Sequence, residues 1–442
     1  MLLCTIYVMA PYISTVVIGD PVRGQAIISG WHKTSGIIIA LTAPFLGAAS
    51  DRMGRRKPLL GAAVLMLAGA TLAQYWALPA GEGGLPLWLI GAAVTFAGVM
   101  FVYTEVFHNS MLVRAAHPEV LHHVSGLGLS LGNLSSVLLL VFVLVGVALP
   151  GQVHWPFVLD APLFGLDPAK HEPSRVVALI SAGWLLVFSV PLFLYTPDLD
   201  TTGEKFGNAL RHGAGNVLRT LRKLSHYRNV ALFLFARMLY ADGKTAILIF
   251  SGVYAAGVMS WGLIEMLALG ATLTLFAVLG GFAGGWLDHH VGPKRAVIVE
   301  LVMALTSLIA MVSMAPGRMF FVLPVDADAH VWNGPVFQTA PELAYVGVAI
   351  FAAISITAAY ASSRTLMARL APKGMEGELF GLYALSGSAT AWLGPLLVEI
   401  FTSAYHSQRA GFASVAILLV AGLALLLFVR PPPANGAPQA HR

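Results

Sequence analysis

The sequence predicts an all-α membrane protein with twelve transmembrane helices in two pseudo-symmetric six-helix bundles. The first observation is composition: 57% of the 442 residues are hydrophobic and only 11% are charged, against about 25% charged residues in soluble domains. The other two are a series of long apolar runs and an internal repeat. A soluble fold this apolar would expose large hydrophobic patches. The composition therefore excludes a soluble enzyme, a nucleic-acid-binding module and a disordered protein.

Twelve apolar runs are long enough to cross a bilayer, which takes about 20 helical residues. These runs lack the short alternating pattern of barrel strands, so we expect helices, which pair their own backbone groups in lipid. Residues 1–19 lack the basic start and the cleavage site of a signal peptide, and we interpret them as a span. The runs lie at 1–19, 31–50, 58–78, 85–106, 124–149, 175–196, 230–254, 261–287, 293–314, 342–363, 379–403 and 409–430.

The distribution of basic residues predicts the orientation. With a cytoplasmic N-terminus, the inner loops and tail hold eighteen of the 26 Lys and Arg residues, and the outer loops hold five. The positive-inside rule favours this arrangement. We therefore expect an integral protein of a bacterial inner membrane, with both termini in the cytoplasm.

The longest inner linker divides the chain into equal halves. We expect an N-terminal bundle at 1–196, a cytoplasmic linker at 197–229, a C-terminal bundle at 230–430 and a disordered tail at 431–442. Apolar residues interleaved with basic ones predict an amphipathic surface helix in the linker. These apolar residues are Phe206, Leu210, Val217, Leu221 and Leu224.

The two halves repeat short features. Arg114 precedes Gly126 by 12 residues, and Arg369 precedes Gly381 by the same spacing. The basic loop around Gly54 has a counterpart near Gly292. Two six-span halves joined by a cytoplasmic linker are typical of rocker-type transporters.

The loop after the second run carries a motif with an acid, two glycines and a basic run at fixed spacing. Gly47 allows two helices to approach closely, Gly54 permits a tight turn, and Asp51 can pair with a basic side chain or cap a helix. The motif resembles the loop signature of the major facilitator superfamily, in which this loop acts as a conformational latch. The alternative is topology anchoring alone. The second copy departs from the signature, with His289 at the acid position and Asp288 one residue earlier. The expected latch residues are Gly47, Asp51, Arg52, Gly54, Arg55 and Arg56.

Five longer stretches are similar to the vacuole-effluxer-like, autophagy-related branch of that superfamily. They are YVMAPYISTVVIGDPVRGQA, FHNSMLVRAA, LFARMLYADGKTAI, SSRTLMARLAP and FGLYALSGSATAWLGPLL with the following SQRAG. The resemblance implies efflux of a small solute, because fungal members are associated with releasing amino acids from the vacuole. Relatives carry a further stretch before the residues that match Met1 onward, so we expect this chain to start inside its first helix.

The seventh run contains the densest group of polar residues: Arg237, Tyr240, Asp242 and Lys244. Ionisable groups at bilayer depth are costly and usually functional. Their spacing does not place the three charges on one helix face. We expect a substrate or proton site here, with an internal ion pair that fixes packing as the alternative. Gly243 is expected to break the helix locally.

Other polar residues within the runs are weaker candidates. Glu105 is a candidate proton carrier or a residue that reaches water at the inner end, and Glu265 is expected to line the cavity or to lie at the outer edge. Asn133 and Tyr383 lie in repeat-related regions and fit either ligand binding or close packing. The residues Trp31, His32 and Lys33 suggest an interfacial anchor or an outer vestibule. Glu300 and Glu399 are further candidates.

The residues predict a secondary active transporter that moves a small polar solute by alternating access. The expected partners are that solute, protons as a candidate coupling ion, and membrane lipids, with no nucleic acid. The phosphate-loop and dinucleotide motifs fail at Met238 and Leu131, so no cofactor is expected. The sequence lacks H-E-x-x-H and has a single cysteine, and we expect neither a metal site nor an enzyme. The alternative function is a lipid or amphiphile translocator on the same fold.

Overall fold

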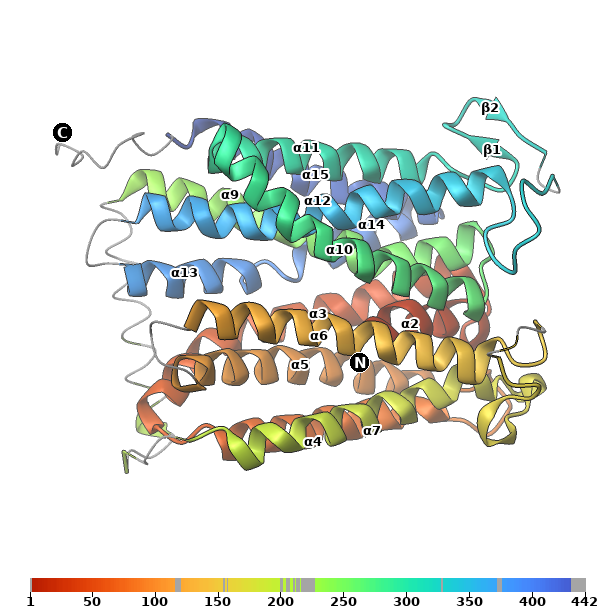
Figure 1. Cartoon of the computed structure of the whole chain (residues 1–442), viewed down its shortest axis with the longest axis horizontal. Helices are drawn as coiled ribbons and strands as arrows, with labels where there is room; N and C mark the ends of the chain where they lie inside the picture. The colour runs from red at the N-terminus through yellow and green to blue at the C-terminus, as the bar shows by residue number, and fades with distance from the viewer. Residues whose placement is uncertain are drawn as a thin grey trace.

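The computed structural model describes residues 2–115, 121–153, 156, 158–198, 202–203, 207–209, 211, 215, 227–326, 329–371 and 376–430. Long helices run side by side along one axis (Figure 1). The N-terminal bundle contains α1 (Leu2–Cys4), η1 (Thr5–Met9), α2 (Ala10–Tyr12), η2 (Ile13–Val17), α3 (Pro21–Met53), α4 (Lys57–Ala73), η3 (Gln74–Trp76), α5 (Leu87–Ala115), α6 (Leu121–Val143), η4 (Leu144–Ala148), η5 (Leu163–Gly165), η6 (Pro168–Lys170) and α7 (Glu172–Tyr195). The C-terminal bundle contains α9 (Arg228–Val258), α10 (Leu263–Val291), α11 (Pro293–Val312), α12 (Ala340–Leu370), α13 (Glu376–Ser388), α14 (Leu393–Tyr405) and α15 (Gln408–Phe428).

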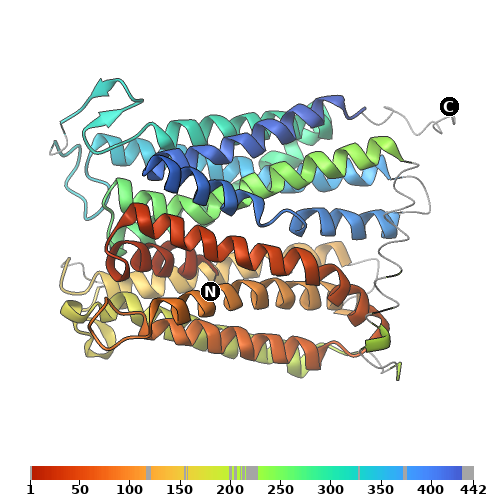
Figure 2. The same cartoon turned by 180° about the vertical axis from the view of Figure 1, so that it is seen from behind.

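The two ends of the molecule differ. One end carries the turns at Gly54 and Gly292 and the end of α15; we call it the basic end. The opposite end, which we call the loop end, carries the described parts of the segments 149–171 and 313–339. There β1 (Arg318–Met319) and β2 (Leu323–Pro324) pair antiparallel, with Arg318 opposite Pro324. Seen from behind, the end of α15 again lies at the basic end, whereas the start of α1 lies about midway along the helices (Figure 2).

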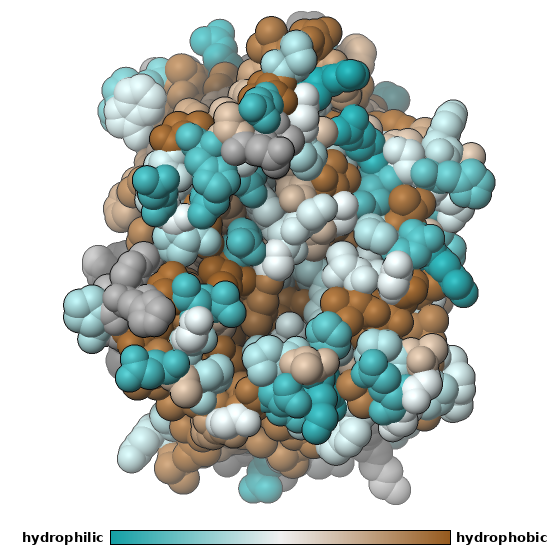
Figure 3. Space-filling model, turned by 90° about the vertical axis from the view of Figure 1, so that its right-hand side faces the viewer, coloured by the Kyte–Doolittle hydropathy of each residue, from teal (hydrophilic) through white to brown (hydrophobic). Residues whose placement is uncertain are grey.

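The sides of the bundle are apolar. Large hydrophobic side chains face outward along the helices, among them Leu65, Val187, Phe282 and Trp286. The loop end instead shows many hydrophilic residues between apolar ones (Figure 3). Since lipid is the only solvent that favours such sides, this surface matches a protein embedded in a bilayer.

The helical membrane fold is confirmed. Within the described residues, nine helical segments meet the length and composition expected of a membrane span. The helices α3 and α9 have 33 and 31 residues but carry more charges, and the first apolar segment, Leu2–Val17, is shorter. The architecture is thus compatible with twelve spans.

The expected repeat of the basic turns has a structural counterpart. Gly54 ends α3 with φ of +84°, and Gly292 ends α10 with φ of +81°. Side chains disfavour this backbone region, so both turns favour glycine. The acid of the second copy also has a clear position, since Asp288 is buried while His289 and His290 are exposed.

Two expectations lie outside the described residues. The apolar positions of the expected linker helix, 206, 210, 217, 221 and 224, are not described, and neither is the tail at 431–442. The boundaries of the two bundles at 196 and 230 therefore stay a prediction.

Candidate functional site

The helix α9 holds the centre of the C-terminal bundle through Arg237. The guanidinium group donates hydrogen bonds to the carbonyl oxygen of Tyr383 at 2.5 Å and to the hydroxyl of Ser386 at 2.6 Å. Its central carbon also lies 3.5 Å from the centroid of the Tyr383 ring. Arg237 is buried, and these contacts replace the water it loses. The side chain therefore joins α9 to the end of α13.

The helical span is interrupted between α13 and α14, and Asp242 binds the α14 side of this helix break. Its carboxylate accepts a hydrogen bond from the backbone N–H of Gly394 at 2.8 Å, in the first turn of α14. A helix N-terminus attracts negative charge and a helix C-terminus attracts positive charge. Asp242 and Arg237 thus match the two helix ends that face each other at residues 389–392.

The break expected at Gly243 is wrong. The helix α9 is continuous from Arg228 to Val258, and the interrupted span is the one expected at 379–403. A Cβ atom at Gly243 would lie 3.0 Å from the Leu419 side chain, so the glycine serves close packing against α15. The discontinuous helix does exist, but α9 supplies the charges that stabilise it.

Lys244 is the other basic residue of the polar group on α9, and it contacts aromatic rings instead of the helix ends at residues 389–392. The ammonium nitrogen lies 3.8 Å from the centroid of the Tyr360 ring and 5.5 Å from that of Tyr240. The Tyr240 hydroxyl shares a hydrogen bond with Ser363 at 2.9 Å. Aromatic faces attract cations, so the three side chains form a cation-binding aromatic group between α9 and α12.

Glu105 approaches this region from the N-terminal bundle. It lies on α5 and is exposed, as is Arg364 on α12. The two interact electrostatically across the bundles, and Glu105 also acts on Tyr360. The arrangement places the acidic Glu105 of the N-terminal bundle opposite the basic Arg364 of the C-terminal bundle, while Lys244 lies buried against the Tyr360 ring.

The remaining candidate residues lie in different parts of the structure. Tyr383 belongs to the site through Arg237, and Asn133 on α6 is partly exposed and forms no hydrogen bond with the described residues. Glu265 lies at the loop end, where its carboxylate accepts a hydrogen bond from the Gly262 backbone at 3.0 Å and caps α10. Glu265 thus lies in the first turn of its helix, and its assignment to the outer edge of the membrane stays a prediction.

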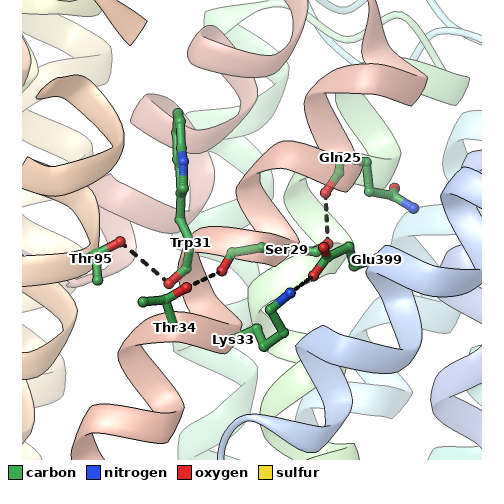
Figure 4. Close-up of polar contacts among 8 residues, drawn as sticks. Gln25, Ser29, Trp31, Lys33, Thr34, Thr95 and Glu399 are labelled. Carbon is green, nitrogen blue, oxygen red and sulfur yellow. Dashed lines mark hydrogen bonds and ion pairs between the residues drawn. The ribbon is translucent and has the colours of Figure 1, made fainter. Parts of the chain in front are cut away.

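Close contacts join the bundles toward the loop end (Figure 4). Lys33 on α3 forms an ion pair with Glu399 on α14 at 2.6 Å. Nearer to that end, the amide nitrogen of Gln25 donates hydrogen bonds to the Thr402 hydroxyl at 2.8 Å and to the Gln408 carbonyl at 3.0 Å. The sequence indicated Lys33 and Glu399 as two separate candidates. No sequence feature predicted that these residues, 366 positions apart, form an ion pair.

The basic loop is held by an acid that the sequence analysis missed. Asp198, just after α7, accepts hydrogen bonds from the backbone N–H groups of Arg56 at 2.9 Å and Lys57 at 3.2 Å. It therefore caps α4. Gly54 makes the turn, and a Cβ at Gly47 would touch Val106 of α5 at 3.4 Å. The Asp51 side chain lies outside the described residues, and the latch role stays a prediction.

Replacing Asp198 with alanine should destabilise this corner. The α4 N-terminus would lose a carboxylate cap, which costs about 1 kcal/mol. Thermal unfolding of the detergent-purified protein measures the loss. Asp160→Ala, at an exposed position of the loop end, is the control and should leave the melting temperature unchanged; equal melting temperatures for both variants would contradict the capping role.

The chain matches a family model and is similar to known proteins of yeast and bacteria. A family model described as "Vacuole effluxer Atg22 like" matches residues 33–435. Autophagy-related protein 22 of Yarrowia lipolytica is 22% identical in an alignment of 354 residues that covers 75% of this chain and 54% of that protein. The uncharacterized MFS-type transporter YxiO of Bacillus subtilis is 23% identical over 401 residues, which cover 89% of this chain and 82% of that one.

Solved structures show the same fold. The nucleoside transporter NupG matches with a TM-score of 0.63 at 12% identity, covering 96% of this chain and 94% of its own. The xylose transporter XylE from E. coli, in an inward open conformation, matches with a TM-score of 0.62 at 12% identity, covering 98% and 95%. At this identity the likeness concerns the fold alone.

Proposed function

Because the chain belongs to the Atg22-like family and is a membrane transporter of the major facilitator type, we propose that it is a secondary active transporter for an amino acid or a related metabolite. The observation that carries the proposal is the charge arrangement between the bundles. Glu105 supplies a negative group from one bundle and Arg364 a positive group from the other, and Lys244 lies buried against Tyr360, on which Glu105 also acts. A solute with both an amine and a carboxylate matches both sides.

The same groups fit alternating access. A zwitterionic solute between the bundles contacts both of them, so its binding changes the relative stability of the open and closed conformations. The direct contacts formed by Gln25 and Lys33 close the loop end. The positive-inside rule assigns the basic end to the cytoplasm of a bacterial inner membrane. In this conformation we infer that solute enters and leaves from the cytoplasmic side.

Uptake by proteoliposomes tests the substrate class. The purified protein, reconstituted in lipid vesicles, is expected to take up part of a radiolabelled amino acid mixture, and single unlabelled amino acids should compete. Absence of amino acid uptake together with movement of fluorescent lipids between leaflets would favour the lipid or amphiphile translocator instead.

Glu105→Gln should lower this uptake about tenfold, since a charge-assisted contact to the amine is worth about 1.5–3 kcal/mol. The exposed carboxylate contributes little to folding, so the melting temperature should stay the same. Glu82→Gln, at an exposed position in the loop before α5, is the control and should transport normally. Full uptake by the Glu105→Gln protein would show that Glu105 does not bind the solute.

A further inference from the structure

A second group of buried charges lies between α9, α10 and α11, away from the contacts that Arg237 and Asp242 make at the helix break between α13 and α14. Lys244, Glu300 and Asp288 are exposed by only 1%, 2% and 8%. Glu300 interacts electrostatically with both Lys244 and Asp288, although none of the three forms a direct ion pair among the described residues. The group extends from the basic end, at Asp288, to the middle of α9, at Lys244.

Two carboxylate oxygens in this group lack a hydrogen-bond partner among the described residues. Glu300 accepts a hydrogen bond from the Ser362 hydroxyl through Oε1 at 2.8 Å, whereas its Oε2 is buried without a hydrogen bond. Oδ1 of Asp288 is likewise buried without a hydrogen bond to the described residues. A buried acceptor without a donor is costly. A proton on the carboxyl group removes the charge and supplies a donor.

In the part of this bundle that the structure describes, the buried charges also do not balance. Arg237 and Asp242 each face a helix end of matching polarity. Lys244, Glu300 and Asp288 together leave one negative charge in excess. Burying an uncompensated charge is unfavourable, and one bound proton restores neutrality.

We propose that Glu300 is the proton-binding site of the transporter, and this inference rests on the proposed function. The proton forms an O–H bond to Oε2, and no other covalent bond changes. The charged or titratable groups that face Glu300 are Lys244 and Tyr240 from α9 and Asp288 from α10. Ser362 faces it from α12, and the described part of α15 that crosses the bundle, residues 410–428, carries no charge.

The proton and the solute are coupled through Lys244. A solute carboxylate bound at Lys244 compensates its positive charge, so that Lys244 stabilises ionised Glu300 less and Glu300 holds its proton more strongly. By reciprocity, protonation of Glu300 strengthens solute binding. The expected transport is therefore symport of one proton with the solute.

Infrared difference spectroscopy of the purified protein between about pH 5 and about pH 8 detects the protonated carboxyl directly. The wild type should show a carboxylic C=O band that Glu300→Gln loses, while Ser362→Ala should retain the band but change its frequency. Glu265→Gln, a carboxylate that caps α10 at the loop end, is the control and should leave the band unchanged. A band of undiminished intensity in a folded Glu300→Gln protein would overturn the assignment.

Transport separates this inference from the proposed function. In proteoliposomes, Glu300→Gln should exchange labelled for unlabelled amino acid but lose accumulation driven by an inward proton gradient. Gradient-driven accumulation equal to the wild type would overturn the coupling role. If the wild type moves no amino acid but the band is lost in Glu300→Gln, the proposed substrate fails and the proton site stands.

Discussion

Uptake by Arg237→Ala is expected to fall at least about tenfold, and the variant should lose about 3 kcal/mol of folding stability. The guanidinium group makes two hydrogen bonds to α13 and stacks on the Tyr383 ring. Hydrogen bonds to a charged group contribute about 1.5–3 kcal/mol, and a desolvated cation–π contact about 2 kcal/mol. Without them, α13 is no longer fixed beside α9, and the residues of the break lose their position.

The matched control is Arg175→Ala in the other bundle. Arg175 is buried, lies 4.5 Å from the Tyr75 ring centroid and donates a hydrogen bond to the Tyr75 carbonyl at 2.8 Å. Its loss should lower the melting temperature by a similar amount, yet uptake per folded molecule should be retained because its contacts stay within the N-terminal bundle. Equal loss of uptake in both variants would reduce the role of Arg237 to general stability. Arg237→Lys should recover part of the function, since an ammonium group can donate the two hydrogen bonds that leave from Nη1 but has no plane to stack on the Tyr383 ring.

The fold and part of the site could be predicted from the sequence because their signals are local. Apolar runs and basic loops are properties of neighbouring residues, and they identified the membrane helices and the turns at Gly54 and Gly292. The polar group on α9 was found for the same reason. Its partners were not predictable, because Asp242 binds Gly394, 152 positions away, through a backbone N–H group that carries no sequence signature.

The mistake at Gly243 has a physical origin. Glycine in a membrane helix serves either a break or close helix packing, and only the neighbour in space decides between them. At Gly243 that neighbour is α15. The interruption instead lies at SATAW, residues 388–392, which has no proline or glycine of its own but is flanked by Gly387 and by Gly394 and Pro395. There Asp242 and Arg237 stabilise the two helix ends that the interruption creates.

Gly36→Leu should stop transport by preventing closure of the loop end. A Cβ atom at Gly36 would lie 2.6 Å from the backbone of Ala391, at the break between α13 and α14. Overpacking of this kind costs about 1–3 kcal/mol, and it acts only where α3 meets the C-terminal bundle. Such a cost shifts the equilibrium between conformations about 5- to 150-fold toward the state in which this contact is open. Gly69→Leu on α4, with nothing within 4 Å, should transport normally.

Cysteine labelling can separate a conformational block from unfolding. The single native cysteine, Cys4, is buried, so a Cys4→Ser background permits one reporter. Gln25→Cys replaces a side chain that is fully buried between α3, α14 and α15. A membrane-impermeant maleimide should label it at least about tenfold faster when Gly36→Leu is present. If the Gly36→Leu protein is folded and inactive but the reporter stays unreactive, closure at the loop end is not what the substitution blocks. In that case α3 must act on the break itself, through the position of Asp242.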